Sequence, residues 1–206
     1  MYEKYGQFID GKWHKSSTGE TYEVINPANE EIIGKASKAS SEDVDKALLS
    51  AQKGLEVWKK TPPWQRAYIL RRIADKMREK QDILAKWMTL EVGKPFAEAK
   101  GEVNGAADIY EWNAEETKRI YGQTVESRFE DTRVHVYYQP VGVVAALVPW
   151  NFPLVLSARK ISTALAAGCS VIVKPDVITP GVVMEQVEIC RECGVPPGVV
   201  NLLSGD

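Results

Sequence analysis

The sequence predicts an α/β fold centred on a parallel sheet. Three observations predict it: an apolar strand at Val143–Val148, a helix that begins at Pro153, and a second apolar strand over residues 170–173. The first run is too short for a helix, and Pro149 ends it because proline has no N–H for a sheet ladder. Strand, helix and strand with tight connections form a βαβ unit with a right-handed crossover. The unit therefore predicts a partial Rossmann-like parallel sheet.

Residues 1–121 are expected to supply two small β-hairpins and then helices. Residues 7–14 alternate around Asp10-Gly11, a strong two-residue hairpin signal. Residues 22–25 and 31–34 flank Asn26-Pro27 and predict a second hairpin. These hairpins are expected to precede the helices.

Four helices are predicted next. Ser40 and Asp43 suit the start of the first, and its expected apolar face carries Val44, Leu48, Ala51, Leu55 and Trp58. Pro62-Pro63 ends it. Amphipathic segments then follow around Ile69, Leu70, Ile73 and Met77, and around Ile83, Leu84, Trp87 and Met88. After the stop at Gly93-Lys94-Pro95, a long polar helix is expected over residues 96–121, with Val103, Ala107, Tyr110 and Ala114 as its apolar stripe.

Residues 122–140 are predicted to form a two-stranded ribbon. Val134, Val136 and Tyr138 alternate with polar or aromatic neighbours, as in a strand with one buried face, and residues 124–128 are the expected partner strand. A two-stranded ribbon is marginal alone, so it is expected to pack on another element or another subunit. Residues 141–206 then continue the βαβ unit with a helix over 180–193 and a third strand over 199–203.

Composition excludes several classes of protein. The 206 residues carry a net charge of −2, which leaves no basic face for nucleic acid or an anionic membrane. No apolar run approaches the roughly 18–20 residues of a membrane span, and the polar, aromatic N-terminus does not resemble a secretory signal. Three cysteines, an odd number, favour reduced thiols in a cytoplasm-like compartment.

The turn between the first strand and its helix is the candidate site. Trp150, Asn151 and Phe152 lie at the carboxyl edge of the predicted sheet, where such sheets bind ligands. The Asn151 amide can donate to a developing oxyanion near a helix N-terminus. Alternatively, Asn151 only caps the helix. Trp150 offers a flat face to a cofactor or lies buried in the core.

Three cations near this turn are further candidates. Lys174 ends the second strand at the ligand edge, where it meets a ribose hydroxyl or phosphate, or else extends to solvent. The usual glycine fingerprint for dinucleotides, G-x-G-x-x-G, does not occur. Arg159 and Lys160 stand out in an otherwise apolar helix, on faces about 100° apart, and weakly favour an anionic substrate.

Cys190 and Cys193 form a C-x-x-C pair that we do not interpret as a redox or zinc site. The pair lies at a predicted helix C-terminus, whereas a low thiolate pKa requires a helix N-terminus. Zinc needs two further ligands, and the two histidines, His14 and His135, are far away in the sequence. No metal site is predicted.

Six motifs in order then identify a resemblance. They are Phe8-Ile9-Asp10-Gly11-Lys12-Trp13, Asn26-Pro27-Ala28, Glu91-Val92-Gly93-Lys94-Pro95, Pro149-Trp150-Asn151-Phe152-Pro153, the segment from Ala166 to Pro180 containing Lys174-Pro175, and Gly194-Val195-Pro196 with Gly198-Val199-Val200-Asn201. Together they resemble the aldehyde dehydrogenase superfamily along nearly the whole chain. The third motif has valine where the family has threonine.

The resemblance implies NAD(P)-dependent oxidation of an aldehyde to a carboxylic acid. By the family's pattern, Asn151 holds the oxyanion and Lys160 belongs to a proton relay. Leu147, Val148, Pro149 and Trp150 line the cofactor site, and Lys174 binds the adenosine ribose. Leu156 and Arg159 face the substrate. The ribbon at 122–140 mediates homo-oligomerisation.

Two departures from the family's pattern concern specificity. Val177 replaces the cofactor-selecting glutamate, and Asp176 beside it is a candidate substitute, so the resemblance leaves NAD and NADP both open. Arg159 resembles the arginine of succinate semialdehyde and of lactaldehyde or glycolaldehyde dehydrogenases. Its guanidinium suits a substrate carboxylate, which favours a small semialdehyde or hydroxyaldehyde.

The resemblance covers roughly the first two fifths of a typical member. The glutamate of the family's ELGGK motif, the cysteine of its GQxC motif and the catalytic domain are not in these 206 residues. The chain alone is therefore expected to be inactive. The alternative is a standalone, non-enzymatic module that binds nucleotide or assembles through its ribbon.

Overall fold

A five-stranded sheet forms the centre of the protein in a computed structural model that describes residues 2–206. Its strand order is β2-β1-β9-β8-β7. The parallel part comprises β7 (Val143–Val148), β8 (Ser170–Pro175) and β9 (Val200–Leu202), as predicted. β1 (Gln7–Ile9) runs antiparallel both to β9 and to β2 (Lys12–His14). The α/β fold is confirmed, but the first hairpin belongs to the central sheet, so the sheet is mixed.

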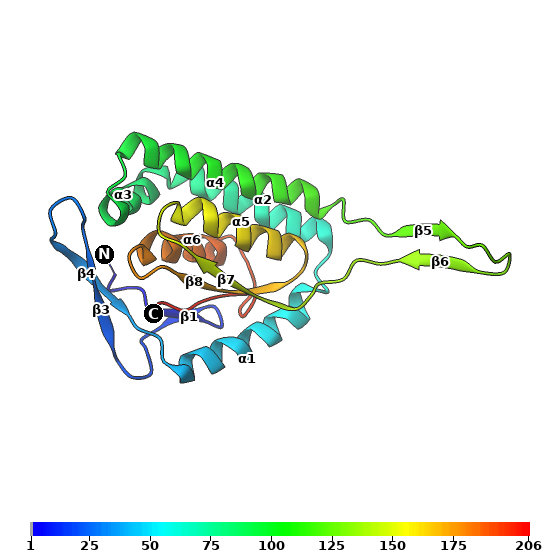
Figure 1. The fold of residues 1–206 in the computed structure, drawn as a ribbon, viewed down its shortest axis with the longest axis horizontal. Coiled ribbons are helices and arrows are strands. Elements are labelled where there is room, and N and C mark those ends of the chain that lie inside the picture. Colours follow the sequence, from blue (N-terminus) through cyan, green and yellow to red (C-terminus); the bar gives the residue numbers. More distant parts are fainter. Residues whose placement is uncertain (1) are drawn as a thin grey trace.

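Helices cover both faces of this sheet (Figure 1). α5 (Pro153–Ala166) and α6 (Pro180–Glu192) pack on one face, and α1 (Ser41–Trp58) packs on the other. α2 (Pro63–Glu79) and α4 (Phe96–Thr117) lie beyond α5, while α3 (Gln81–Val92) packs against α4 and α6. Apolar side chains predicted to face inward are buried on α2 and α4: Ile69, Leu70, Ile73, Met77, Val103, Ala107, Tyr110 and Ala114.

The inner face of α1 differs from the prediction. Ser40 forms the expected capping box with Asp43, but Val44 and Leu48 are exposed. Ala51 and Trp58 of the predicted face are buried, and the rest of the face that packs on the sheet consists mainly of small residues, including Ala47 and Gly54. A Cβ at Gly54 would lie 2.2 Å from the carbonyl carbon of Gly198. The backbones approach so closely that only small side chains fit between them.

Two further hairpins lie outside the central sheet. β3 (Thr21–Ile25) pairs with β4 (Ile32–Ser37), and β5 (Gln123–Glu126) pairs with β6 (Arg133–Val136). The β5–β6 ribbon extends away from the body of the protein (Figure 1). Every residue of both its strands is exposed, so the buried face predicted for the second strand is not formed within this chain. The proposed division at residues 121/122 and 140/141 stays a prediction.

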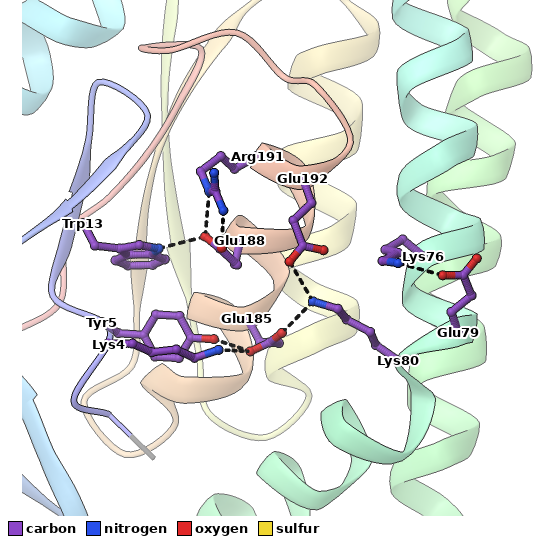
Figure 2. Close-up of polar contacts among 10 residues, drawn as sticks. All are labelled: Lys4, Tyr5, Trp13, Lys76, Glu79, Lys80, Glu185, Glu188, Arg191 and Glu192. Carbon is purple, nitrogen blue, oxygen red and sulfur yellow. Dashed lines mark hydrogen bonds and ion pairs between the residues drawn. The ribbon is translucent and has the colours of Figure 1, made fainter.

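Polar contacts hold the N-terminal segment against α6 (Figure 2). Tyr5 and Lys4 both donate to the buried Glu185, and Trp13 Nε1 donates to Glu188 at 2.8 Å. Lys80, between α2 and α3, reaches the same Glu185 at 3.1 Å. With β1 paired to β9, these contacts cover the edge of the parallel strands that would otherwise be open. Over residues 2–206, no helix is both long and apolar enough to cross a membrane.

Candidate functional site

The turn between β7 and α5 is exposed, and a contact to its backbone holds it in place. Phe152 is the N-cap residue of α5 and contributes no side-chain cap. Asn151 is exposed, and its backbone carbonyl accepts a hydrogen bond from Lys94 Nζ at 3.3 Å. Within residues 2–206 its side-chain amide has no hydrogen-bond partner. The alternative in which Asn151 caps the helix is therefore wrong, and the amide is available to a ligand.

Glu102 of α4 performs the capping instead. Its Oε1 accepts from the backbone N–H groups of Leu154 and Val155, at 3.0 and 3.2 Å. The Glu102 side chain is only 2% exposed. A carboxylate is favourable there because the unpaired N–H groups of a helix N-terminus carry partial positive charge. Glu102 thereby fixes where α5 begins.

Lys94 connects this cap to the turn. It forms an ion pair with Glu102, and its Nζ lies 3.8 Å from the centroid of the Phe152 ring. Its side chain is 10% exposed. Lys94 follows Gly93, which has φ of 76° and ends α3 in the left-handed conformation typical of helix ends. Gly93 and Lys94 were predicted as a helix stop and as part of a family motif, but not as contacts of this turn, and Glu102 was not predicted at all. The motif that contains Lys94 was the available signal.

A cavity of about 470 Å³ lies between α4 and the beginning of α5. It brings together three predicted site residues, Asn151, Leu156 and Arg159. Phe152 and Val155 add apolar wall, and Lys94, Glu98, Glu102, Gly101 and Gly105 complete the lining. Arg159 is exposed and forms no ion pair with any residue in the described range 2–206. The cavity thus combines an apolar wall, an amide and an unpaired guanidinium.

Lys160 does not line this cavity, although it neighbours Arg159. It is half-buried, on a different face of α5. The three cysteines do not line it either, and all are buried. Burial raises the pKa of Cys190 to about 12, the opposite of what an activated thiolate requires.

The predicted cofactor residues lie at one edge of the sheet. Leu147 is in register with Lys174, so β7 and β8 end side by side. Leu147 is 64% exposed and Trp150 is 50% exposed. Pro149 is also exposed, whereas Val148 is buried and contributes backbone. The alternative of a buried core tryptophan at 150 is wrong. Leu147 and Trp150 leave apolar surface free at the ligand edge.

Lys174 and Asp176 differ in how far their own fold occupies them. Lys174 is half-buried and forms no ion pair with another residue of the described chain. Asp176 Oδ1 accepts a hydrogen bond from the backbone N–H of Ile178 at 3.0 Å, which fixes the turn before α6. The edge of the sheet thus presents apolar surface beside a lysine that forms no ion pair within residues 2–206.

The sequence matches known proteins over nearly its whole length. The profile of the aldehyde dehydrogenase family matches residues 13–206. The glutarate-semialdehyde dehydrogenase of Pseudomonas aeruginosa is 44% identical over 198 residues, which cover 96% of this chain and 41% of that protein. The NADP(+) succinate-semialdehyde dehydrogenase of Escherichia coli is 44% identical over 197 residues, with the same coverage of both.

Solved structures agree as well. An NADP-dependent enzyme from E. coli superposes with a TM-score of 0.96 at 43% identity, over 98% of this chain and 42% of that one. A betaine aldehyde dehydrogenase from Staphylococcus aureus in complex with NAD+ superposes with a TM-score of 0.95 at 35% identity, with the same coverage. The chain thus spans about two fifths of the length of its relatives. From the matched residues and the shared fold, the chain belongs to the aldehyde dehydrogenase family.

Proposed function

We propose that this chain forms the N-terminal, cofactor-binding portion of an NAD(P)-dependent dehydrogenase that oxidises a small aldehyde to a carboxylic acid. The substrate in this proposal is a semialdehyde or a hydroxyaldehyde. The observation that carries it is the cavity in which Asn151, Leu156 and Arg159 meet. Relatives named as glutarate- and succinate-semialdehyde dehydrogenases support the same substrate class.

The two polar groups of the cavity lie at different levels of α5. Asn151 precedes the helix, and Arg159 is six positions after Pro153, a rise of about 9 Å along the helix axis. The Arg159 guanidinium binds a carboxylate through two parallel hydrogen bonds. Phe152, Val155 and Leu156 supply the apolar wall for a few methylene groups between the ends.

Asn151 has the position of an oxyanion donor in this proposal. Its amide stands free at the N-terminus of α5, while Lys94 and Glu102 hold the turn in place. A fixed donor stabilises charge that develops on the aldehyde oxygen. We assign Lys160 to proton transfer, beyond the cavity wall.

The edge formed by β7 and β8 is the proposed cofactor site. Leu147, Val148, Pro149 and Trp150 line it, Lys174 binds a ribose hydroxyl, and Asp176 lies beside it. When bound, the nicotinamide group would accept hydride from the substrate carbon. Residues 122–140 mediate homo-oligomerisation in this proposal, which gives the exposed ribbon a partner surface.

The 206-residue chain is proposed to be inactive by itself. Its three cysteines are buried and none lines the cavity, so the nucleophile and the general base come from the part of the relatives that this chain does not match. We expect the purified chain to form no NAD(P)H from succinate semialdehyde. A rate well above the no-protein blank would contradict this.

Fusion of the chain to the C-terminal portion of the P. aeruginosa relative tests the substrate assignment. Arg159→Leu should raise KM for succinate semialdehyde about tenfold or more, because a charge-assisted, bidentate contact is lost. KM for butanal, which lacks the carboxylate, should change less than about twofold. Arg119→Leu, an exposed arginine outside the cavity, is the matched control. An equal effect on both aldehydes would exclude Arg159 as the carboxylate contact.

A further inference from the structure

A second cavity, of about 420 Å³, lies at the base of the ribbon. It is formed where α1 ends and α2 begins, together with the chain that leaves the ribbon and the end of α5. Lys59, Lys60, Thr61, Arg66, Tyr138 and Pro140 are among its lining residues. It shares no residue with the cavity beside Asn151. The aldehyde chemistry proposed above does not use it.

Arg66 is the unusual residue of this cavity. Arg66 is only 7% exposed, and its Nη1 donates a hydrogen bond to the backbone carbonyl of Thr61 at 2.8 Å. Its Nε is buried and has no hydrogen-bond partner among residues 2–206. No carboxylate of the described chain forms an ion pair with it. An uncompensated buried charge is costly, and burial lowers the pKa of this guanidinium.

The fold compensates part of this charge. Gly168 follows α5, and a Cβ there would lie 3.3 Å from Arg66 Nη1. The guanidinium therefore lies against the C-terminal end of α5, where free carbonyl groups carry partial negative charge. This contact involves the Nη1 side of the guanidinium. The Nε side, which suits two parallel hydrogen bonds to an oxyanion, stays without a protein partner.

The other surroundings of the cavity are also positive. α2 begins at Pro63 with no side-chain cap and no acidic residue in its first turn. Pro63 has no N–H, and the N–H groups of Gln65 and Arg66 donate to the Pro62 carbonyl, so the helix N-terminus adds a partial positive charge that no acidic side chain of its first turn offsets. Lys60 is exposed and forms no ion pair within the described residues, and Lys59 pairs only with Glu56 of its own helix. Arg66, Lys60 and the beginning of α2 thus line one cavity, and no carboxylate from residues 2–206 lines it with them.

We propose that this cavity binds an oxyanion, a phosphate or a carboxylate, between Arg66, Lys60 and the first turn of α2. The anion supplies the missing counter-charge and an acceptor for the guanidinium. It comes from a dissolved small molecule or from a carboxylate on a second copy of the chain. The chemistry of the two sources is the same, and their dependence on protein concentration differs.

The test titrates inorganic phosphate into the purified 206-residue chain at constant ionic strength, with sodium chloride as the balancing salt. Thermal unfolding and calorimetry should show saturable stabilisation by phosphate, since a ligand that binds only the folded state raises Tm. Lys60→Gln should weaken phosphate binding about three- to tenfold, and Arg66→Gln about tenfold or more. Equal responses to phosphate and chloride would overturn the proposal.

Arg72→Gln is the matched control. Arg72 lies on α2, as Arg66 does, but it is exposed and does not line the cavity. If Arg72→Gln weakens phosphate binding as much as Lys60→Gln, the effect is general electrostatics and the proposal fails. Lys60 is exposed, so its variant folds and carries the test even if Arg66→Gln unfolds.

Sedimentation at several protein concentrations distinguishes the two sources. If the chain self-associates and phosphate dissociates it, phosphate competes with a carboxylate of a second copy for this cavity. Phosphate that binds without changing the mass indicates a dissolved anion. In either case, Lys60→Gln should weaken phosphate binding. If Lys60→Gln binds phosphate as tightly as the native chain in both thermal unfolding and calorimetry, there is no anion site in this cavity.

Discussion

The N-termini of α5 and α6 are built alike but differ in charge balance. Each helix begins with proline, at Pro153 and Pro180, and neither has a side-chain cap of its own. Each receives a buried glutamate from a distant helix, which accepts from the next two backbone N–H groups. For α5 this is Glu102 of α4, and for α6 it is Glu91 of α3, which accepts from Gly181 and Val182 at 2.6 and 3.1 Å.

The two glutamates use their oxygens differently. Glu102 accepts both backbone N–H groups at Oε1 and keeps Oε2 for a side chain, whereas Glu91 accepts from Gly181 at Oε1 and from Val182 at Oε2. Glu102 forms an ion pair with Lys94. Glu91 accepts a hydrogen bond from the Tyr2 hydroxyl and has no cation as a partner within residues 2–206. Burial raises the pKa of Glu91 to about 7, although the Tyr2 and backbone hydrogen bonds act in the opposite direction. A buried capping glutamate therefore has a full counter-charge at the proposed catalytic turn and, within residues 2–206, none at α6.

Close packing explains why glycine follows Pro180 but leucine follows Pro153. A Cβ at Gly181 would lie 2.7 Å from Glu91 Oε1 and 2.3 Å from the Trp87 ring. Glu91 and Trp87 thus occupy the space of that side chain. A helix start can thus be stabilised by a residue 52 to 91 positions away, and the counter-charge of that residue decides how its contribution to stability responds to pH.

Of the substitutions at these two caps, Glu102→Ala is expected to lower the free energy of unfolding most. It leaves two N–H groups of α5 uncapped and Lys94 buried without its partner. Breaking a buried ion pair from one side typically lowers the free energy of unfolding by about 3–5 kcal/mol. Urea denaturation measures the loss. Glu98→Ala, an exposed residue one turn earlier on α4, should change stability by less than about 0.5 kcal/mol, and a similar loss in both variants would contradict the assignment.

Glu91→Gln should change how stability depends on pH. The folded-state pKa of Glu91, about 7, lies above its ordinary value of 4.5, so the native state binds this proton more tightly than the unfolded state. The contribution is fully present below about pH 4.5 and is lost as pH rises through about 7, by an amount on the order of 3 kcal/mol. Denaturation from about pH 5 to about pH 8 should show this decline in the native chain and not in Glu91→Gln. An identical decline in both proteins would show that another group titrates.

Tyr2→Phe is expected to have the smallest effect. It removes one donor to Glu91 while the two backbone donors remain, so the free energy of unfolding should fall by about 1 kcal/mol. The Tyr2 hydrogen bond favours the ionised carboxyl, so its loss should raise the pKa of Glu91 further and move the decline to higher pH. Tyr68→Phe, with an exposed ring, serves as the control. A shift of the decline to lower pH would contradict this role for Tyr2.

The candidate site was partly predictable because its residues share one local motif. Asn151, Leu156 and Arg159 lie on one turn and the first two turns of one helix, and they meet in one cavity. Lys94 and Glu102 were missed, because their contacts with the turn depend on how α4 packs beside α5. The inner face of α1 was predicted from hydrophobic periodicity, and Val44 and Leu48 are exposed because backbone approach at Gly54 selected the face with small residues.

Local patterns in the sequence were enough to predict the order and the type of the elements, the βαβ unit and the turn at Asn151. Apolar periodicity, prolines and glycines act within a few residues, so they are visible in a single chain. Packing between distant segments was needed to show that β1 joins β9, that Glu91 and Glu102 cap distant helices, and that Arg66 is buried without a carboxylate partner among residues 2–206. Those contacts depend on which surfaces pack together. The unpaired charge of Arg66 after packing is what identifies the cavity at the base of the ribbon as a second candidate site.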